Sequence, residues 1–173
     1  MLLSRLTPAV ATLLAFVGGL AAILTAWGFQ ILGGYAPCKL CLEQRVPYYI
    51  GLPLALLALV LLWKGHMRSL AMLLLLAVAA VFVYGAGLGV YQSGAEWGFW
   101  PGPVDCGGGA AIPSSAAGML NALKSTRVVS CTEASWRLLG LSFAGWNAVA
   151  SAAVALLALA AALGLRARRD RTV

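Results

Sequence analysis

Four long apolar runs, separated by more polar segments, dominate the hydrophobic pattern of this chain. They cover about residues 8–32, 46–63, 70–91 and 143–165. Each is close to the roughly 20 residues that an α-helix needs to cross the hydrocarbon core of a bilayer. The second run is the shortest and contains Pro47, which suits a first helical turn, and Pro53, which should kink the helix. The pattern therefore predicts four transmembrane helices.

Composition indicates the same class of protein. Apolar residues make up 62% of the chain, charged residues 10%, and the mean hydropathy is +0.91. A water-soluble globule of this size would have too little polar surface to cover itself. We therefore expect an all-α integral membrane protein, with residues 1–173 forming one four-helix bundle. Gly85 with Gly89, and Gly18 with Ala22, have the spacing that permits close contact between membrane helices.

The first apolar run is longer than the ~7–15 residues of a signal-peptide core, so we expect it to stay as the first helix. Two loops, 33–45 and 92–142, then fall on one side of the membrane. The second is too long for a simple connector. Ser115 is a candidate N-cap for a short amphipathic helix that would lie on the bilayer surface. The glycines at 107–109 predict either a flexible segment or a plain linker.

The distribution of charge predicts the orientation. The termini and the loop near residue 66 carry seven Lys or Arg against one Asp, a balance of +6, whereas the two cysteine-bearing loops carry five against four, a balance of +1. The positive-inside rule then places both termini in the cytoplasm and the two loops in the periplasm, across a bacterial inner membrane. The net charge of +7 thus follows from topology, and we interpret the arginine-rich tail as a membrane-surface anchor rather than a nucleic-acid site.

All four cysteines fall in these two loops. Cys38 and Cys41 form a C-x-x-C segment just before the second apolar run, and Cys106 and Cys131 lie further apart in the long loop. A C-x-x-C pair is a poor structural staple but a good redox couple, because the spacing tunes thiol acidity and reduction potential. Cys106 and Cys131 are open to two interpretations, a structural disulfide or a second redox pair. Arg45 adds a positive charge close to Cys41.

A metal site is the alternative use of four cysteines. Structural zinc sites usually repeat the short C-x-x-C spacing, and the second pair here does not. The single histidine, His66, lies on the opposite side of the predicted membrane. We therefore expect no bound metal.

Three segments resemble the DsbB family of bacterial disulfide bond formation proteins. They are residues 38–45 (Cys-Lys-Leu-Cys-Leu-Glu-Gln-Arg), residues 103–106 ending in Cys106, and residues 130–147 from Ser-Cys to Trp-Asn. The predicted number of helices, the order of the loops and the sidedness of the cysteines also agree. The resemblance therefore covers nearly the whole chain, and it implies a fold of four transmembrane helices.

The resemblance also implies a function for each site residue. Cys106 would form a mixed disulfide with a soluble periplasmic dithiol protein of the DsbA type, and Cys131 would exchange with Cys38. Cys41 would be the thiolate that meets a membrane quinone, ubiquinone or menaquinone. Arg45 matches the family arginine beside the quinone ring, where a fixed positive charge stabilises a thiolate and a developing quinone anion.

One departure and several rival functions remain. Many family members carry a histidine near the place of Gln92, which can form hydrogen bonds but cannot act as an imidazole acid. A conduit for reductant would need cysteines within the predicted spans, and a permease would need polar residues along the bundle interior. The remaining alternative is a non-catalytic membrane scaffold with structural disulfides, which would bind no quinone.

Overall fold

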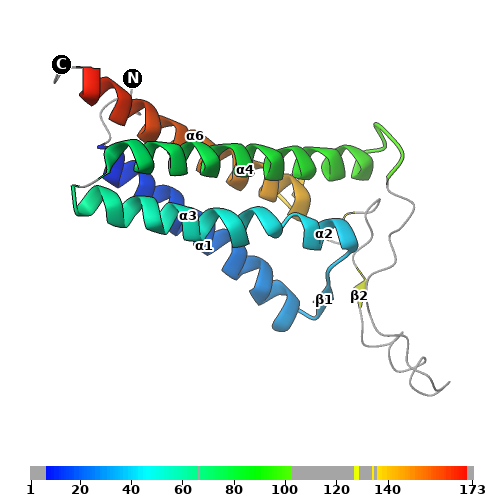
Figure 1. Ribbon diagram of the computed structural model, residues 1–173. Helices are drawn as coiled ribbons and strands as arrows, with labels where there is room; N and C mark the ends of the chain where they lie inside the picture. Colours follow the sequence, from blue (N-terminus) through cyan, green and yellow to red (C-terminus); the bar gives the residue numbers. More distant parts are fainter. Residues whose placement is uncertain (1–6, 66, 103–126, 129–133, 135, 171–173) are drawn as a thin grey trace.

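The computed structural model describes residues 7–65, 67–102, 127–128, 134 and 136–170. Four long helices pack as a bundle (Figure 1): α1 (Pro8–Ile31), α3 (Val46–Trp63), α4 (Arg68–Glu96) and α6 (Phe143–Asp170). Each is long and apolar enough to cross a membrane. The most extensive contact in the bundle is between α4 and α6; α3 packs against α4, and α1 packs against α6 and α3. The predicted fold class, a four-helix membrane bundle, is confirmed.

Two helices extend further than the hydrophobic runs indicated. Helix α4 continues through Gln92 to Glu96, so the long loop begins later than predicted, and α6 runs on to Asp170. The apolar run ends at Tyr91, but the next turn of α4 is held by protein contacts. Gln92, Gly94 and Ala95 are buried, and the indole nitrogen of Trp100 donates a hydrogen bond to the carbonyl of Tyr91 at 2.8 Å. The predicted amphipathic helix at Ser115 lies outside the described residues.

Short elements gather at one end of the bundle (Figure 1). They are β1 (Tyr35–Ala36), α2 (Lys39–Glu43), β2 (Arg127–Val128), β3 (Arg137–Leu138) and β4 (Leu141–Ser142). Strands β1 and β2 pair in parallel, and β3 and β4 form an antiparallel hairpin. Both turn residues of this hairpin, Leu139 and Gly140, have positive φ, at 52° and 83°. Positive φ at both turn positions is typical of tight hairpins. Strand β4 of this hairpin leads directly into α6.

Small residues allow the helices to approach closely, but not all of those predicted do so. A Cβ added to Gly89 on α4 would lie 2.8 Å from the backbone nitrogen of Ala148 on α6. The prediction for Gly18 is wrong, because a Cβ there would have no atom within 4 Å. Its neighbour Gly19 is the glycine that packs, against Leu52 of α3. Spacing alone cannot identify the packed face, since adjacent residues on a helix point about 100° apart.

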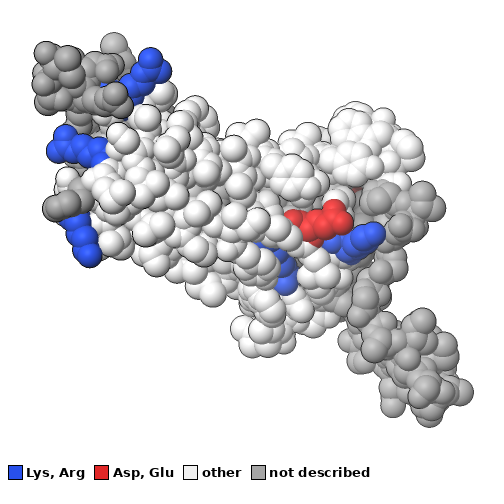
Figure 2. Space-filling model, viewed as in Figure 1, with Lys and Arg blue, Asp and Glu red and all other residues white. Residues whose placement is uncertain are grey.

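Charged side chains are distributed unevenly between the two ends of the bundle. Figure 2 shows Lys and Arg side chains at the end that holds both termini in Figure 1, and acidic together with basic side chains at the other end. Lys64 follows α3, Arg68 begins α4 and Arg166 lies in the last turns of α6, all at the first end. The opposite end carries α2 and the C-x-x-C segment.

Candidate functional site

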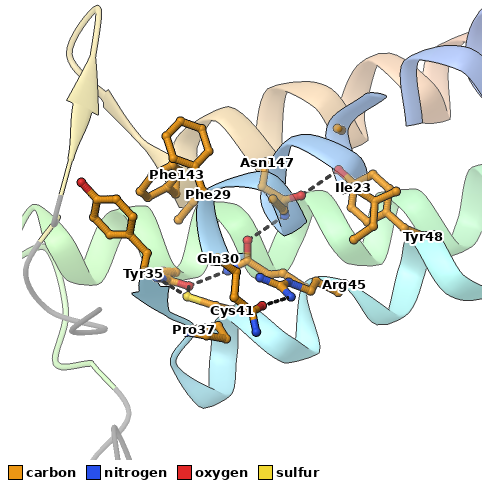
Figure 3. Close-up of a pocket in the computed structure, with 15 residues that line it drawn as sticks. Ile23, Phe29, Gln30, Tyr35, Pro37, Cys41, Arg45, Tyr48, Phe143 and Asn147 are labelled. Carbon is orange, nitrogen blue, oxygen red and sulfur yellow. Dashed lines mark hydrogen bonds between the residues drawn. The ribbon is translucent and has the colours of Figure 1, made fainter. Parts of the chain in front are cut away.

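A cavity of about 110 Å³ lies among the helices beside α2 (Figure 3). Residues of α1, α3, α4 and α6 line it, together with the segment from β1 to Arg45. Its polar or ionisable lining residues are Gln30, Tyr35, Cys41, Gln44, Arg45, Tyr48, Gln92 and Asn147. The remaining lining residues are apolar, and they include Phe29, Phe143 and Pro37. The cavity thus combines apolar walls with convergent polar groups, as is usual for small-molecule sites.

The C-x-x-C segment forms the one-turn helix α2. Residues three apart in a helical turn lie on one face, and the sulfur atoms of Cys38 and Cys41 are accordingly 2.6 Å apart. Cys38 is the N-cap of α2, and its sulfur accepts a hydrogen bond from the backbone N–H of Cys41 at 3.2 Å. Cys38 is fully buried, whereas Cys41 is half-buried and lines the cavity. The two cysteines of the motif therefore occupy different environments.

Arg45 lies between α2 and α3 and is 9% exposed. Its guanidinium group donates a hydrogen bond to Gln30 Oε1 at 2.5 Å and lies 5.3 Å from the centroid of the Trp27 ring. Figure 3 shows Arg45 and Gln30 together at the cavity. Both neighbours come from α1 and both are neutral. The structure therefore brings the positive charge of Arg45 and the sulfur of Cys41 to one cavity.

A chain of polar side chains crosses the bundle behind Cys41. Asn147 of α6 donates from Nδ2 to Gln44 Oε1 at 2.7 Å, and Gln44 donates from Nε2 to Gln92 Oε1 at 2.5 Å. The hydroxyl of Tyr48 donates to Asn147 Oδ1 at 2.7 Å. The sequence pattern pointed to Gln92 and Asn147 but gave no site role to Gln30, Gln44 or Tyr48. The signal that could have found them is a polar side chain inside or beside an apolar run, since such residues in membrane helices are usually functional.

Aromatic rings form the outer wall of the cavity. Phe143 packs edge-on against Phe29 with centroids 4.8 Å apart, and it stacks on Trp136 at 5.0 Å. Tyr35 of β1 contacts both Phe29 and Phe143. These contacts fix β1 and the start of α6 against the end of α1. These ring contacts therefore hold Tyr35 and Phe143, which both line the cavity, against α1.

The sequence of the chain was compared with models of known protein families. The model described as "Disulfide bond formation protein DsbB" matches residues 8–161. The chain belongs to the DsbB family. Comparisons with curated proteins and with solved structures found no match.

Membership of the DsbB family establishes the general function. The chain is a multi-pass membrane protein of disulfide bond formation and a disulfide-generating oxidoreductase. Of its four cysteines, Cys38 and Cys41 are in the described structure, whereas Cys106 and Cys131 lie outside the described residues.

Proposed function

We propose that this DsbB-family protein reoxidises a periplasmic dithiol protein of the DsbA type and passes the electrons to a membrane quinone. The observation that carries the proposal is the shared cavity of Cys41 and Arg45. It offers a redox-active sulfur and a buried positive charge to the same small molecule. Cys38, Cys41, Cys106 and Cys131 are the proposed catalytic residues, and Cys41 and Arg45 are the proposed quinone contacts.

The cavity suits the ring of a quinone. Its volume of about 110 Å³ is comparable to the roughly 150 Å³ of an engineered apolar cavity that binds benzene. Phe29 and Phe143 offer faces and edges to a flat ring, and Arg45 offers donors to a carbonyl oxygen on which negative charge develops. The isoprenoid tail of the quinone would extend into the surrounding lipid. A quinone supplies a two-electron acceptor of high potential, which a strongly oxidising DsbA-type partner near −120 mV requires.

The pairing of β1 with β2 supports transfer between the two cysteine pairs. Tyr35 pairs with Arg127, and Ala36 pairs with Val128. Cys38 follows Ala36 by two positions in the sequence, and Cys131 follows Val128 by three. Because the two strands are parallel, the segments that follow them leave the pair in the same direction. The pairing thus tethers the segment that precedes Cys131 to the segment that precedes Cys38.

The proposed reaction balances in three exchanges. The partner dithiol attacks a Cys106–Cys131 disulfide through a mixed disulfide on Cys106, and the partner leaves oxidised while Cys106 and Cys131 become thiols. These thiols then reduce the Cys38–Cys41 disulfide. Finally, the Cys38–Cys41 dithiol returns to the disulfide, and its two electrons and two protons convert a quinone to a quinol. Each of the first two steps forms one disulfide bond and breaks another, whereas the third forms a disulfide bond by reducing the quinone.

Orientation follows from the same proposal. DsbA-type partners are periplasmic, so the end of the bundle that carries α2 faces the periplasm, and both termini face the cytoplasm. The +6 against +1 charge balance supports this arrangement in a bacterial inner membrane. Phe29, Phe143 and Arg45 would contact the ring of either ubiquinone or menaquinone.

The test is catalytic turnover by the purified protein. In detergent with added ubiquinone-1 or menadione, the protein should oxidise an excess of reduced DsbA-type protein and form one quinol for each disulfide. Cys41→Ser should abolish quinol formation. A non-catalytic scaffold would show neither reaction, which would overturn the proposal.

A second experiment tests the order of electron flow. A partner whose second active-site cysteine is replaced by alanine cannot resolve the mixed disulfide, so a covalent complex should accumulate through Cys106. Cys106→Ser should abolish this complex, and Cys41→Ser should retain it because Cys41 acts later. A trapped bond at Cys38 or Cys41 would contradict the proposed order.

A further inference from the structure

We propose that Gln92 is a fixed hydrogen-bond donor to the sulfur of Cys41, held in its orientation by a one-way chain of hydrogen bonds across the bundle. The inference rests on the proposed function, in which Cys41 is the sulfur that faces the quinone. It assigns a role to a buried glutamine of α4 whose amide faces Cys41.

This chain of hydrogen bonds has a single direction, because a tyrosine hydroxyl has one hydrogen to donate, an amide oxygen only accepts and an amide nitrogen only donates. A tyrosine hydroxyl has one hydrogen, and Tyr48 donates it to Asn147 Oδ1. The contact of 3.1 Å between Tyr48 and Ser151 must therefore be donated by Ser151. With its oxygen occupied by Tyr48, Asn147 donates from its nitrogen to Gln44. Each amide thus accepts on oxygen and donates from nitrogen to the next.

The chain ends at the amide of Gln92. Its oxygen accepts the hydrogen bond from Gln44 at 2.5 Å, so its nitrogen remains for other acceptors. That nitrogen is 3.7 Å from Cys41 Sγ and 3.4 Å from Glu96 Oε1. The amide oxygen is further from the sulfur, at 4.0 Å. Because Glu96 Oε1 accepts a hydrogen bond from this nitrogen, Glu96 favours the same orientation of the amide.

A thiolate only accepts hydrogen bonds, so an N–H donor beside Cys41 favours the form of the cysteine that gives up electrons. Gln92 is 1% exposed, so water does not compete for this donor. Successive hydrogen bonds also polarise one another, which strengthens the last donor in the chain. Unlike a histidine ring, the amide keeps the same number of donors and no charge at every pH in the physiological range. Among the described residues, the ionisable groups near the network are Cys38, Arg45, Tyr48, Glu96 and Arg137, and the test below substitutes none of them.

The test is the pH dependence of alkylation at Cys41 in the full-length, reduced protein in detergent, without quinone. Cys106 and Cys131 are replaced by serine, and the modified Cys41 peptide is quantified by mass spectrometry. Gln92→Met should move the midpoint of the rate profile about one pH unit higher, since hydrogen bonds to charged groups have effects of this order. Gln92→His, which restores a ring donor, should recover at least half of that shift.

Two further variants complete the design. Gln44→Met leaves Gln92 in place but frees its oxygen, so the midpoint should rise by a smaller amount. Ser93→Ala is the matched control, because it removes a buried hydroxyl of α4 that has no hydrogen-bond partner in the described structure, and the midpoint should not move. An unchanged midpoint in both Gln92→Met and Gln44→Met would overturn the inference. Failure of quinol formation in the unmodified protein would instead overturn the proposed function, because this titration uses neither quinone nor partner.

Discussion

Arg45 shows how a single residue combines local and distant constraints. It lies at the junction of α2 and α3, yet its guanidinium group is held by Trp27 and Gln30 of α1. The hydrogen bond fixes the direction of the planar group, and the ring face offsets part of the cost of burying its charge. The cavity therefore has a positive charge whose position does not depend on a counter-ion among the residues described around it.

We predict that Arg45→Ala impairs use of the quinone while the thiols still exchange. A lost hydrogen bond to a developing anion corresponds to about a tenfold to hundredfold loss in kcat/KM for quinone. Arg45→Lys should recover only part of this loss, because lysine lacks the planar fork of donors. Steady-state kinetics with varied quinone provides the measurement, and accumulation of the trapped Cys106 complex verifies that the fold is intact. Arg137→Ala, an exposed arginine that does not line the cavity, is the control. Equal kinetics in Arg45→Ala and the wild type would refute the assignment.

At the scale of the helices, the bundle depends on a close approach between α4 and α6. Gly89 lies against backbone atoms of α6, with the carbonyl oxygen of Ala144 and the nitrogen of Ala148 both within 3 Å of a Cβ built on it. Backbone atoms cannot rotate away as a side chain can. The same pair of helices carries Gln92 and Asn147, so their spacing also sets the geometry of the polar chain behind Cys41.

We predict opposite effects for two alanine substitutions. Gly89→Ala should destabilise the protein by about 1–3 kcal/mol, because the added methyl forces α4 and α6 apart. Gly18→Ala should be neutral or stabilise it by up to about 1 kcal/mol, because the methyl enters open space and alanine favours helix. Reversible unfolding of both variants in mixed micelles measures the difference. If both substitutions had the same effect, close packing at Gly89 would not explain the glycine.

At the scale of the whole molecule, the two ends of the bundle differ in the residues and elements that they carry. One end gathers Lys64, Arg68 and Arg166, and the other gathers α2, the cavity and the two small β-pairs (Figures 1 and 2). The cavity lies beside α2, and Cys41 of the C-x-x-C segment lines it. This arrangement suits an enzyme that joins a water-soluble dithiol to a lipid-soluble acceptor.

Orientation can be tested with two cysteine probes in a background where all four native cysteines are serine. Leu139→Cys places a thiol in the β3–β4 turn, where the native side chain is 86% exposed. Lys64→Cys places one at the opposite end of the bundle, after α3. A membrane-impermeant maleimide added to spheroplasts should label position 139 and leave position 64 unlabelled until the membrane is disrupted. The reverse pattern would invert the proposed topology.

The sequence alone determined the class, the helix number and the chemistry, because these depend on local properties. Four runs of apolar residues predict four membrane helices, whatever their packing, and the Cys38–Cys41 spacing predicts a redox pair from one turn of chain. The match to the DsbB family confirms the resemblance found in these segments. Arg45 was predicted in the same way, because it follows Cys41 in the motif, and its role beside a quinone stays a prediction.

The tertiary structure decided which side chains meet across helices. Gln44 contacts Gln92, which is 48 positions away, and Asn147, which is 103 positions away. No local pattern relates residues so far apart, since their contact depends on the rotation and spacing of α4 and α6. The same reason explains why Gly19 rather than Gly18 packs, and why α4 continues to Glu96. Hydropathy selects the segments that enter the membrane, but only packing selects the face that each helix turns toward Cys41.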